Sequence, residues 1–222
     1  MTLAPDAVRT MFDRIAPIYD AMNRVMTAGL DLRWRRLAAA AVVRSGDEVL
    51  DAACGTGDFA VADARAGAAR VVGLDFSERM LERARRKAPE IEWVQGDMLA
   101  LPFADGSFDA ATVGFGVRNT ELERALAELR RVLRPGGRLA VLEITRPRGP
   151  LRIFYALWFD RIVPLLGRLL PGGEAYSYLP ASVRRFPPAE ELAGLMRRAG
   201  FGDVGIRRLG GSIVALHTGT AR

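Results

Sequence analysis

The sequence predicts an α/β protein, a doubly wound domain built on a mostly parallel sheet. Short apolar runs alternate with segments of helical spacing, and the runs are apolar almost throughout, which is typical of strands covered on both faces. A chain of 222 residues, half of them hydrophobic, is long enough for one sizeable core and favours a single domain. The predicted strands are residues 48–53, 70–74, 91–95, 110–115 and 138–144.

Helices are expected between these strands, at residues 58–66, 78–88 and 121–133. The third is the clearest, because its apolar residues recur at helical spacing. Thr120 and Glu123 form a candidate capping box at its start, and Pro135 followed by two glycines is expected to stop it. The region between Gln95 and Ala110 is expected to be loop with at most a turn.

The last part of the chain predicts a helix that begins at a proline pair and ends at Gly200. Two further apolar runs, 204–209 and 212–218, straddle two glycines and predict a closing hairpin. Two pieces lie outside the alternating core, the first 40 residues and residues 146–187. Ligands of open α/β sheets bind outside the carboxyl ends of the strands, so we expect both pieces to form a lid there.

Composition and charge exclude several classes of site. One cysteine, Cys54, and one histidine, His217, rule out an intrachain disulfide and a metal centre built from several such residues. The N-terminus lacks an apolar signal core, and no uncharged apolar run reaches the roughly 20 residues of a membrane span. We therefore expect a cytoplasmic protein. The net charge of +6 would suit nucleic acid, but the basic residues are scattered among acids and no aromatic stacking platform is evident, so no nucleic-acid partner is expected.

The stretch VLDAACGTGDFA, residues 49–60, carries the strongest functional signal. Gly55 and Gly57 flank Thr56 directly after a predicted strand, where glycines let a ligand approach the backbone. The strand ends on Asp51, a poor neighbour for a pyrophosphate and a good one for a cation. Asp75 ends the second strand, 18 residues after Gly57 in the sequence. An acid about 20 residues after the glycine loop is the expected hydrogen-bond acceptor for a ribose.

The third strand ends in Asp97 and Met98, an acceptor for an adenine amine and an apolar side chain to pack on the ring. These residues together suit a ligand with a ribose, an adenine and a positive charge but no phosphates, and S-adenosylmethionine fits that description. The alternative is that these strand-end acids only cap the loops that follow them.

Four stretches resemble the class I S-adenosylmethionine-dependent methyltransferases: VLDAACGTGDFA, VVGLDFSERML, VQGDMLALPFADGSFDAATVGFGVRN and LRPGGRLAVLEIT. Three others resemble, more narrowly, the C-methyltransferases of ubiquinone and menaquinone biosynthesis: residues 12–36, GFGVRN at 114–119, and YSYLPASVRRFP at 176–187. The resemblance covers nearly the whole chain. It implies a Rossmann-like, seven-stranded sheet with a C-terminal antiparallel hairpin.

The resemblance also assigns cofactor contacts to Thr56, Asp75, Asp97 and Met98, and places Gly114 beside the methyl donor, where some members have a serine. It implies transfer of a methyl group to a ring carbon of a polyprenylated quinol. The compact chain favours demethylmenaquinol, with use in ubiquinone biosynthesis left open. Transfer to another small or lipidic acceptor is the nearest alternative.

Methylation of a ring carbon requires a quinol hydroxyl that is deprotonated or strongly polarised. Arg118 is the residue predicted to stabilise the resulting oxyanion, and Asn119 is predicted to add a hydrogen bond. Both residues follow a strand end beside the methyl donor. Arginine stays protonated, so a water or a carboxylate must act as the base, and the sequence does not identify it. Four residues of the two outer pieces either line the quinol pocket or anchor the lid: Tyr19, Tyr176, Tyr178 and Arg185.

Three features of the sequence allow a structural interpretation as well as a functional one. Cys54 is expected to be a packing residue, and His217, in the last predicted strand, to be structural. Residues 151–170 mix apolar residues with arginines. This mixture indicates either a pair of core helices or an interfacial segment that admits the prenyl tail. The insolubility of a prenylated substrate favours peripheral contact with the inner face of the membrane. A homodimer is left open.

Overall fold

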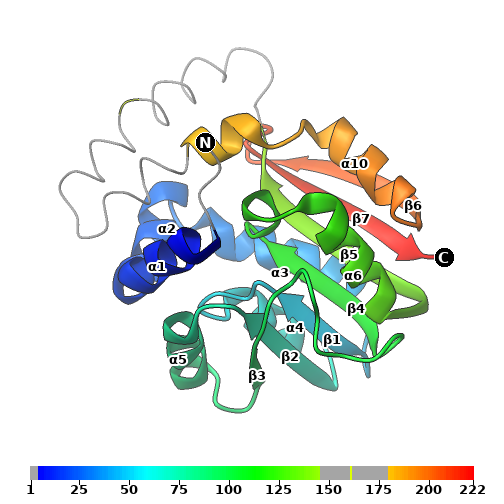
Figure 1. Cartoon of the computed structure of the whole chain (residues 1–222), viewed down its shortest axis with the longest axis horizontal. Coiled ribbons are helices and arrows are strands. Elements are labelled where there is room, and N and C mark those ends of the chain that lie inside the picture. The colour runs from blue at the N-terminus through cyan, green and yellow to red at the C-terminus, as the bar shows by residue number, and fades with distance from the viewer. Residues whose placement is uncertain (1–4, 146–160, 162–179) are drawn as a thin grey trace.

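The computed structural model describes residues 5–145, 161 and 180–222, and a seven-stranded sheet lies at its centre (Figure 1). The strand order is β3-β2-β1-β4-β5-β7-β6. The first five strands pair in parallel, whereas β7 is antiparallel to both β5 and β6. The strands are β1 Glu48–Ala52, β2 Arg70–Asp75, β3 Glu92–Gln95, β4 Phe108–Gly114, β5 Leu133–Ile144, β6 Phe201–Leu209 and β7 Val214–Ala221.

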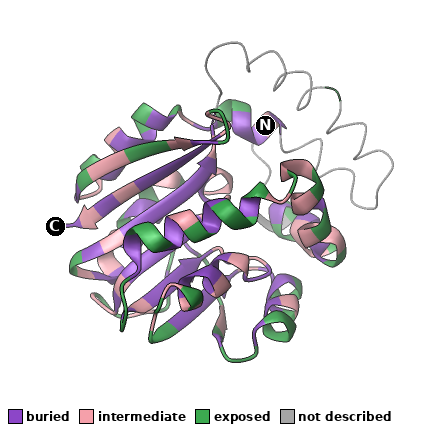
Figure 2. Ribbon diagram, turned by 180° about the vertical axis from the view of Figure 1, so that it is seen from behind, coloured by how far each residue is buried: buried purple, intermediate pink, exposed green. Residues whose placement is uncertain are grey.

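Helices cover both faces of the sheet (Figures 1 and 2). One apolar cluster joins the sheet to α6 (Leu122–Val132) and α10 (Ala189–Arg198), and another joins the opposite face to α3 (Leu30–Val42) and α4 (Asp58–Arg65). The central strands are buried almost throughout, as the apolar runs predict. This confirms the doubly wound α/β class, and the antiparallel β6–β7 pair confirms the closing hairpin, which turns at two glycines with positive φ.

Two local expectations were wrong. Thr120 is not a helix cap: the first cap position is Glu121, without a side-chain hydrogen bond, and the Thr120 hydroxyl donates instead to the carbonyl of Val117. The strand expected at 138–144 begins earlier, at Leu133, so Pro135 and the two glycines after it lie within β5, while α6 ends at Val132, close to the expected end. The sequence pattern misses this early start because arginine, proline and glycine interrupt the apolar run.

The N-terminal helices form a separate small layer beside α5 (Glu78–Lys87). They are α1 (Pro5–Ile15), the short helix η1 (Ala16–Ile18) and α2 (Tyr19–Thr27). Met11, Ile15 and Ala16 pack against Met80 of α5 in an apolar cluster of their own. Figure 1 shows α1 and α2 next to α5, at the end of the molecule away from β6.

Residues 180–185 form a short helix before α10. Most of the expected lid piece 146–187 lies outside the described residues, as does the segment 151–170 apart from Arg161. No helix in the described part of the chain has the length and apolarity needed to cross a membrane.

Candidate functional site

The glycine loop after β1 follows a path that needs residues with small or no side chains. Ala53, Gly55 and Gly57 all have positive φ, at 55°, 56° and 84°. A Cβ added at Gly57 would lie 2.4 Å from the ring of Trp93. Gly57 is also the cap residue of α4, and its N–H donates to the carbonyl of Cys54 at 2.9 Å. The loop therefore offers backbone at the carboxyl end of β1, as predicted for a cofactor-binding turn.

Asp51 lies beneath this loop and is fully buried. Its Oδ2 accepts a 2.8 Å hydrogen bond from the backbone N–H of Ala60, whereas Oδ1 has no partner among residues 5–145, 161 and 180–222. Burial raises the pKa of Asp51 to about 8, although the Ala60 N–H and the Arg35 guanidinium act in the opposite direction. Asp51 thus supports the first turn of α4 and retains one unused buried acceptor atom.

Asp75 ties the end of β2 to the glycine loop. Its Oδ2 accepts from the N–H of Gly55 at 2.8 Å, and its Oδ1 accepts from the N–H of Ser77 at 2.9 Å. Burial raises the pKa of Asp75 to about 6, and its backbone donors lower it. The structure therefore brings Asp75 and Gly55 together, as two contacts of one ligand require.

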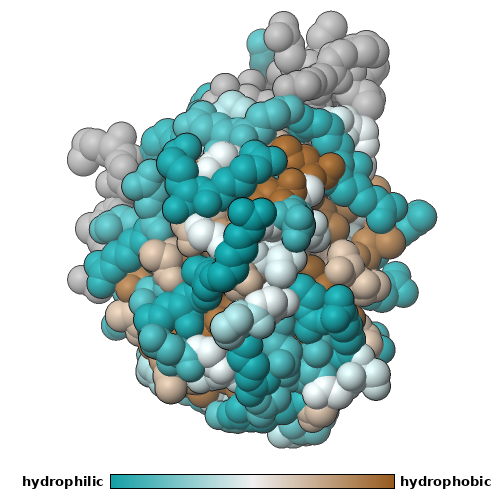
Figure 3. All heavy atoms as spheres, turned by 90° about the vertical axis from the view of Figure 1, so that its right-hand side faces the viewer, coloured by the Kyte–Doolittle hydropathy of each residue, from teal (hydrophilic) through white to brown (hydrophobic). Residues whose placement is uncertain are grey.

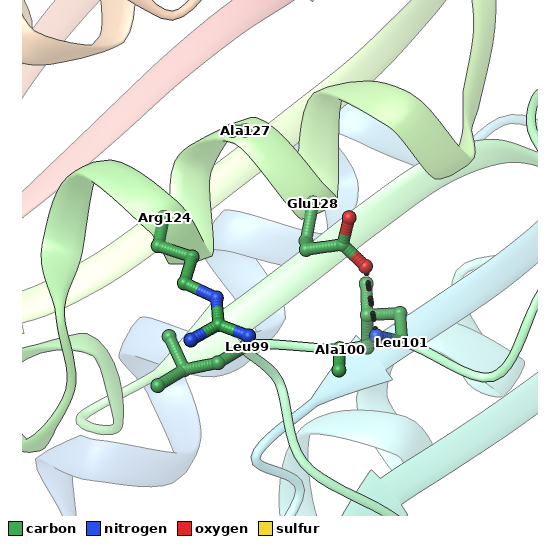
Figure 4. Close-up of a pocket in the computed structure, with 6 residues that line it drawn as sticks. All are labelled: Leu99, Ala100, Leu101, Arg124, Ala127 and Glu128. Carbon is green, nitrogen blue, oxygen red and sulfur yellow. Dashed lines mark hydrogen bonds between the residues drawn. The ribbon is translucent and has the colours of Figure 1, made fainter.

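Asp97 and Met98 lie in different surroundings. Asp97 is exposed, and its Oδ1 accepts from the N–H of Leu99 at 2.9 Å, which is the loop-capping alternative for this acid. Met98 is buried in the apolar cluster beneath α6. A hollow of about 360 Å³ lies next to them between residues 99–101 and α6, where Glu128 accepts from the N–H of Leu101 (Figure 4). None of the predicted site residues lines this hollow.

The N-terminal helices are attached to the glycine loop by polar contacts. The Thr56 hydroxyl donates to Asp20 of α2 at 2.5 Å, so this predicted cofactor residue has a protein partner here. The ammonium group of Lys87 lies 2.7 Å from Asp20 and 2.7 Å from Asp58 at the start of α4. Tyr19 borders the same loop, because a Cβ added at Gly55 would lie 3.9 Å from its ring.

A second contact joins α1 to the loop after β2. The hydroxyl of Ser77, the cap residue of α5, donates to Asp13 at 2.5 Å, and the ring of Phe12 packs edge-on against those of Phe76 and Tyr19. Sequence reasoning missed Asp13, Asp20 and Lys87. The one signal for Lys87 was its rarity, as the single lysine beside 31 arginines.

The end of β4 makes a tight turn towards the glycine loop. A Cβ added at Gly116 would lie 2.7 Å from the Cβ of Ala53, so the two loops are in close contact. A Cβ at Gly114 would lie 2.7 Å from the ring of Phe59, which explains a glycine at this position by packing. Phe115 adopts φ 60°, an uncommon conformation for a non-glycine residue, and the Arg35 guanidinium lies 5.1 Å from its ring centre.

Arg118, in the short helix η2 (Val117–Asn119), forms a buried ion pair with Glu143 near the end of β5. Its Nη1 lies 2.9 Å from Glu143 Oε1 and also contacts the carbonyl of Phe115, and its Nε donates to Ser182 Oγ at 3.4 Å. The side chains are 8% and 1% exposed. Arg118 is therefore a nearly buried residue held by polar contacts, and not a solvated residue at the start of a helix.

Asn119 also supplies a polar atom at this end of the sheet. Its Oδ1 is buried and has no hydrogen-bond partner within the described part of the chain. Of the four residues expected to line the quinol pocket or anchor the lid, Tyr19 borders the glycine loop and Arg185 is exposed on the helix at 180–185. Tyr176 and Tyr178 lie outside the described residues.

Sequence reasoning missed Glu143. Its signal was the same as for Asp51 and Asp75, an acid near the end of an otherwise apolar strand, but no glycine loop or known cofactor contact follows it. Burial raises the pKa of Glu143, while the Arg118 guanidinium and the Ile144 N–H lower it.

Cys54 and His217 have the structural surroundings expected for them. Cys54 is buried, and burial raises the pKa of its thiol well above the ordinary value, which suits packing and not nucleophilic attack. The His217 ring nitrogen Nε2 lies 2.9 Å from the carbonyl of Ala189, so the histidine joins β7 to α10.

Comparison with known proteins gives a full-length match. The model of the ubiE/COQ5 methyltransferase family matches residues 1–221. The demethylmenaquinone methyltransferase of Thermus thermophilus is 48% identical over 218 residues, covering 94% of this chain and 99% of that protein. A ubiquinone/menaquinone biosynthesis C-methyltransferase of Paracoccus denitrificans is 43% identical over 223 residues, covering 96% and 89%.

Solved structures share the fold. A SAM-dependent methyltransferase of Thermotoga maritima superimposes with a TM-score of 0.64 at 24% identity, covering 96% of this chain and all of that one. The [4+2]-cyclase SpnF superimposes with a TM-score of 0.63 at 23% identity, covering 85% and 80%. A cyclase among proteins of this fold illustrates that the fold alone does not determine the reaction.

Proposed function

Because this chain belongs to the ubiE/COQ5 methyltransferase family and is an S-adenosylmethionine-dependent methyltransferase, we propose that it methylates a ring carbon of demethylmenaquinol. The choice of substrate rests on the relative named demethylmenaquinone methyltransferase, which is 48% identical to the chain and is matched over nearly its whole length. The relative from Paracoccus denitrificans, named for both pathways, makes a benzoquinol precursor the second candidate.

The family and the fold imply S-adenosylmethionine as the methyl donor, and the residues at the strand ends suit it. Asp75 would hold the ribose hydroxyls beside the glycine loop 55–57, and Asp51 Oδ1 offers a buried acceptor for a donor of the amino-acid part. Thr56, Asp97, Met98 and Gly114 complete the proposed cofactor set. For Thr56 this requires the hydroxyl to exchange its bond with Asp20 for one with the ligand.

When bound, the donor supplies a methyl group on a positively charged sulfur, which is already electrophilic. The protein must align the quinol with it and increase the electron density on the ring carbon, and alignment alone can lower the barrier by several kcal/mol, roughly 7–11 in favourable cases. Arg118 would stabilise the charge on the quinol oxygen, because its Nη2 has no hydrogen bond to any residue that the structure describes. Asn119, whose buried Oδ1 has no partner among the described residues, would donate its side-chain NH2 group to the same oxygen.

The N-terminal helices would act as a lid over the cofactor, held closed by the contacts of Asp13 and Asp20. Peripheral binding at the inner face of the membrane would give access to a prenylated substrate. Val25, Leu30 and Leu32 support it, as large apolar residues exposed on α2 and α3. The side formed by β6, seen in Figure 3, suits a membrane less, because its surface is mainly hydrophilic with small separate apolar areas.

One assay tests the proposed function. The purified protein is incubated with S-adenosylmethionine and chemically reduced precursors of both ring types, and the products are identified by mass. A product one methyl heavier from demethylmenaquinol supports the proposal, and methylation of the benzoquinol alone would transfer it to the second candidate. If neither ring is methylated while the protein still binds S-adenosylmethionine, the acceptor belongs to another class.

A further inference from the structure

Glu143 is a buried carboxylate that the predicted mechanism does not use. It lies next to the last residue of β5, and its Oε1 accepts two hydrogen bonds, from Arg118 Nη1 and from the N–H of Ile144, both at 2.9 Å. Its Oε2 is buried and has no partner among the residues that the structure describes. A buried carboxylate oxygen without a donor is costly, so this atom is suited to a ligand that brings a hydroxyl group.

Among the residues that the structure describes, Arg118 is the charged side chain in contact with Glu143. Its register partner on β7 is Ala215, which offers no polar side chain. His217 is two positions further along β7, but burial lowers its pKa and it is held by the Ala189 carbonyl. Ser182, on the helix at 180–185, contacts Arg118. Burial raises the pKa of Glu143, and the Arg118 guanidinium opposes this shift because it favours the charged carboxylate.

We propose that Glu143 is the general base of the reaction and takes the proton of the quinol hydroxyl on Oε2. This assignment rests on the proposed function, since it requires a hydroxylated aromatic acceptor. Arg118 then has two roles: its Nη1 holds the carboxylate in place, and its Nη2 would bind the oxygen that loses the proton. An acid and a guanidinium at the ends of β5 and β4 together supply the base that arginine alone cannot be.

The protons and electrons of this reaction balance. The hydroxyl proton moves to Oε2, and the electron pair left on oxygen is delocalised into the ring. The ring carbon forms its bond to the transferred methyl group with that pair, and the donor sulfur keeps the electrons of the bond that breaks. The methylated carbon then loses its hydrogen as a proton to water, which restores the aromatic ring. The quinol oxygen regains the proton held by Glu143, so one proton is released per turnover.

The test compares Glu143→Gln with Glu143→Asp, and with Glu128→Gln as a control. Glutamine keeps the shape of the side chain but cannot take a proton. Glu128 of α6 is a carboxylate that also pairs with an arginine and accepts a backbone N–H, but its partners are Arg131 and Leu101 and not residues proposed to bind the quinol or the cofactor. For each protein the measurements are kcat with saturating quinol from pH 5.5 to 10, the dissociation constant of S-adenosylmethionine and the unfolding temperature.

We expect Glu143→Gln to lower kcat at neutral pH by about 100-fold or more, the usual effect of losing a general base, with cofactor affinity within about twofold of wild type. Its kcat should rise with pH as the quinol ionises in solution, whereas the wild-type kcat should level off once Glu143 is ionised. Glu143→Asp should recover part of the loss at neutral pH, and Glu128→Gln should behave as wild type.

Three outcomes overturn the assignment in an enzyme that methylates quinol. One is a wild-type kcat in Glu143→Gln, and another is a loss of the same size at every pH, which indicates a structural role. If Glu143→Gln does not fold, Glu143→Asp tests the assignment instead. Its carboxylate is set back by one methylene, so kcat should be lower but should still level off at high pH. An unchanged kcat contradicts the assignment. A wild-type protein that methylates no quinol refutes the proposed function instead.

Discussion

The ion pair between Arg118 and Glu143 joins the ends of β4 and β5 by a contact that water hardly reaches. Removing one partner of such a pair leaves an uncompensated buried charge, which typically costs about 3–5 kcal/mol unless the group changes its protonation state. A glutamate without its arginine can respond in that way, by becoming neutral. The two residues therefore act as a unit, and changes at either one affect both the charge and the geometry of the other.

Arg118→Ala is expected to lower kcat by two to three orders of magnitude, on the order of 3–4 kcal/mol, the usual cost of losing one oxyanion-stabilising donor. Arg118→Lys should restore only part of this loss, because an ammonium group cannot reproduce the planar fork of the guanidinium. Cofactor affinity should hardly change in either variant. Measurements of kcat at saturating quinol and of the cofactor dissociation constant check this. An Arg118→Ala enzyme with wild-type kcat would show that the oxyanion is held elsewhere.

The titration of Asp75 predicts how cofactor binding depends on pH. Its pKa is about 6, so below pH 6 the carboxylate becomes neutral and loses acceptor strength for the ribose hydroxyls. The affinity for S-adenosylmethionine should therefore decrease as pH is lowered from 7.5 to 5. This decrease does not reflect unfolding caused by Asp75: its pKa is raised in the folded state, so protonation of this group stabilises the fold as pH falls through that range.

Asp75→Asn separates this effect from others. It should weaken cofactor binding at pH 7.5 by roughly 1.5–3 kcal/mol for each lost bond to the ionised acceptor. Its affinity should also vary less with pH than that of the wild type, as calorimetry at several pH values can establish. Equal affinity of the two proteins at pH 7.5 would remove Asp75 from the cofactor site.

Among the elements, β4 and α4 are packed too closely for a side chain at the end of β4. Gly114→Ala is expected to lower the free energy of unfolding by about 1–3 kcal/mol, because its Cβ would meet the buried ring of Phe59. Gly194→Ala, inside α10, is the matched control: its Cβ would meet only the end of Arg198 at 3.6 Å, and alanine favours a helix by roughly 0.5–1 kcal/mol. Urea unfolding measures the free energy of unfolding of both variants. Equal values for the two would contradict the packing argument.

The contact of α2 with α4 and α5 predicts a role for Lys87 in cofactor retention. Lys87→Ala removes the cation that holds Asp20 and Asp58 together, so the N-terminal helices should be held less firmly over the glycine loop. Because the pairs are partly exposed, we expect a loss of about 1 kcal/mol, or roughly fivefold weaker binding of S-adenosylmethionine. Arg86→Ala, at an exposed neighbour 4.0 Å from Glu82, should have no effect. Equal affinities of both variants would argue against a lid at this contact.

The strands, the helices between them and the hairpin could be predicted because each depends on a local pattern of apolar residues or glycines. The positions of Asp51, Asp75 and the glycine loop at the strand ends could be predicted for the same reason, since each directly follows or ends such a run. The pairing of Arg118 with Glu143 could not, because it depends on two strands that are neighbours only in the folded sheet. The link from Asp20 to Lys87 depends likewise on α2 and α5 packing at the same loop.

The parallel strands place the groups proposed to bind the cofactor and the quinol at one edge of the sheet. The glycine loop and Asp75 follow β1 and β2, whereas Arg118, Asn119 and Glu143 belong to the ends of β4 and β5. Because β1 and β4 are adjacent in the sheet, the two groups of residues lie side by side. This arrangement suits direct transfer between two bound molecules, without a covalent intermediate on the protein.

The proposed reaction requires an acceptor that is a reduced ring, which the protein makes nucleophilic. The most direct measurement follows transfer of an isotope-labelled methyl group from S-adenosylmethionine to demethylmenaquinone under oxygen-free conditions, with and without a chemical reductant, and locates the label by mass and NMR. We expect labelled product only with the reductant, with the label on a ring carbon, because an oxidised quinone ring is electrophilic and has no hydroxyl proton to lose. Equal rates with and without the reductant, or a label on oxygen, would contradict this mechanism.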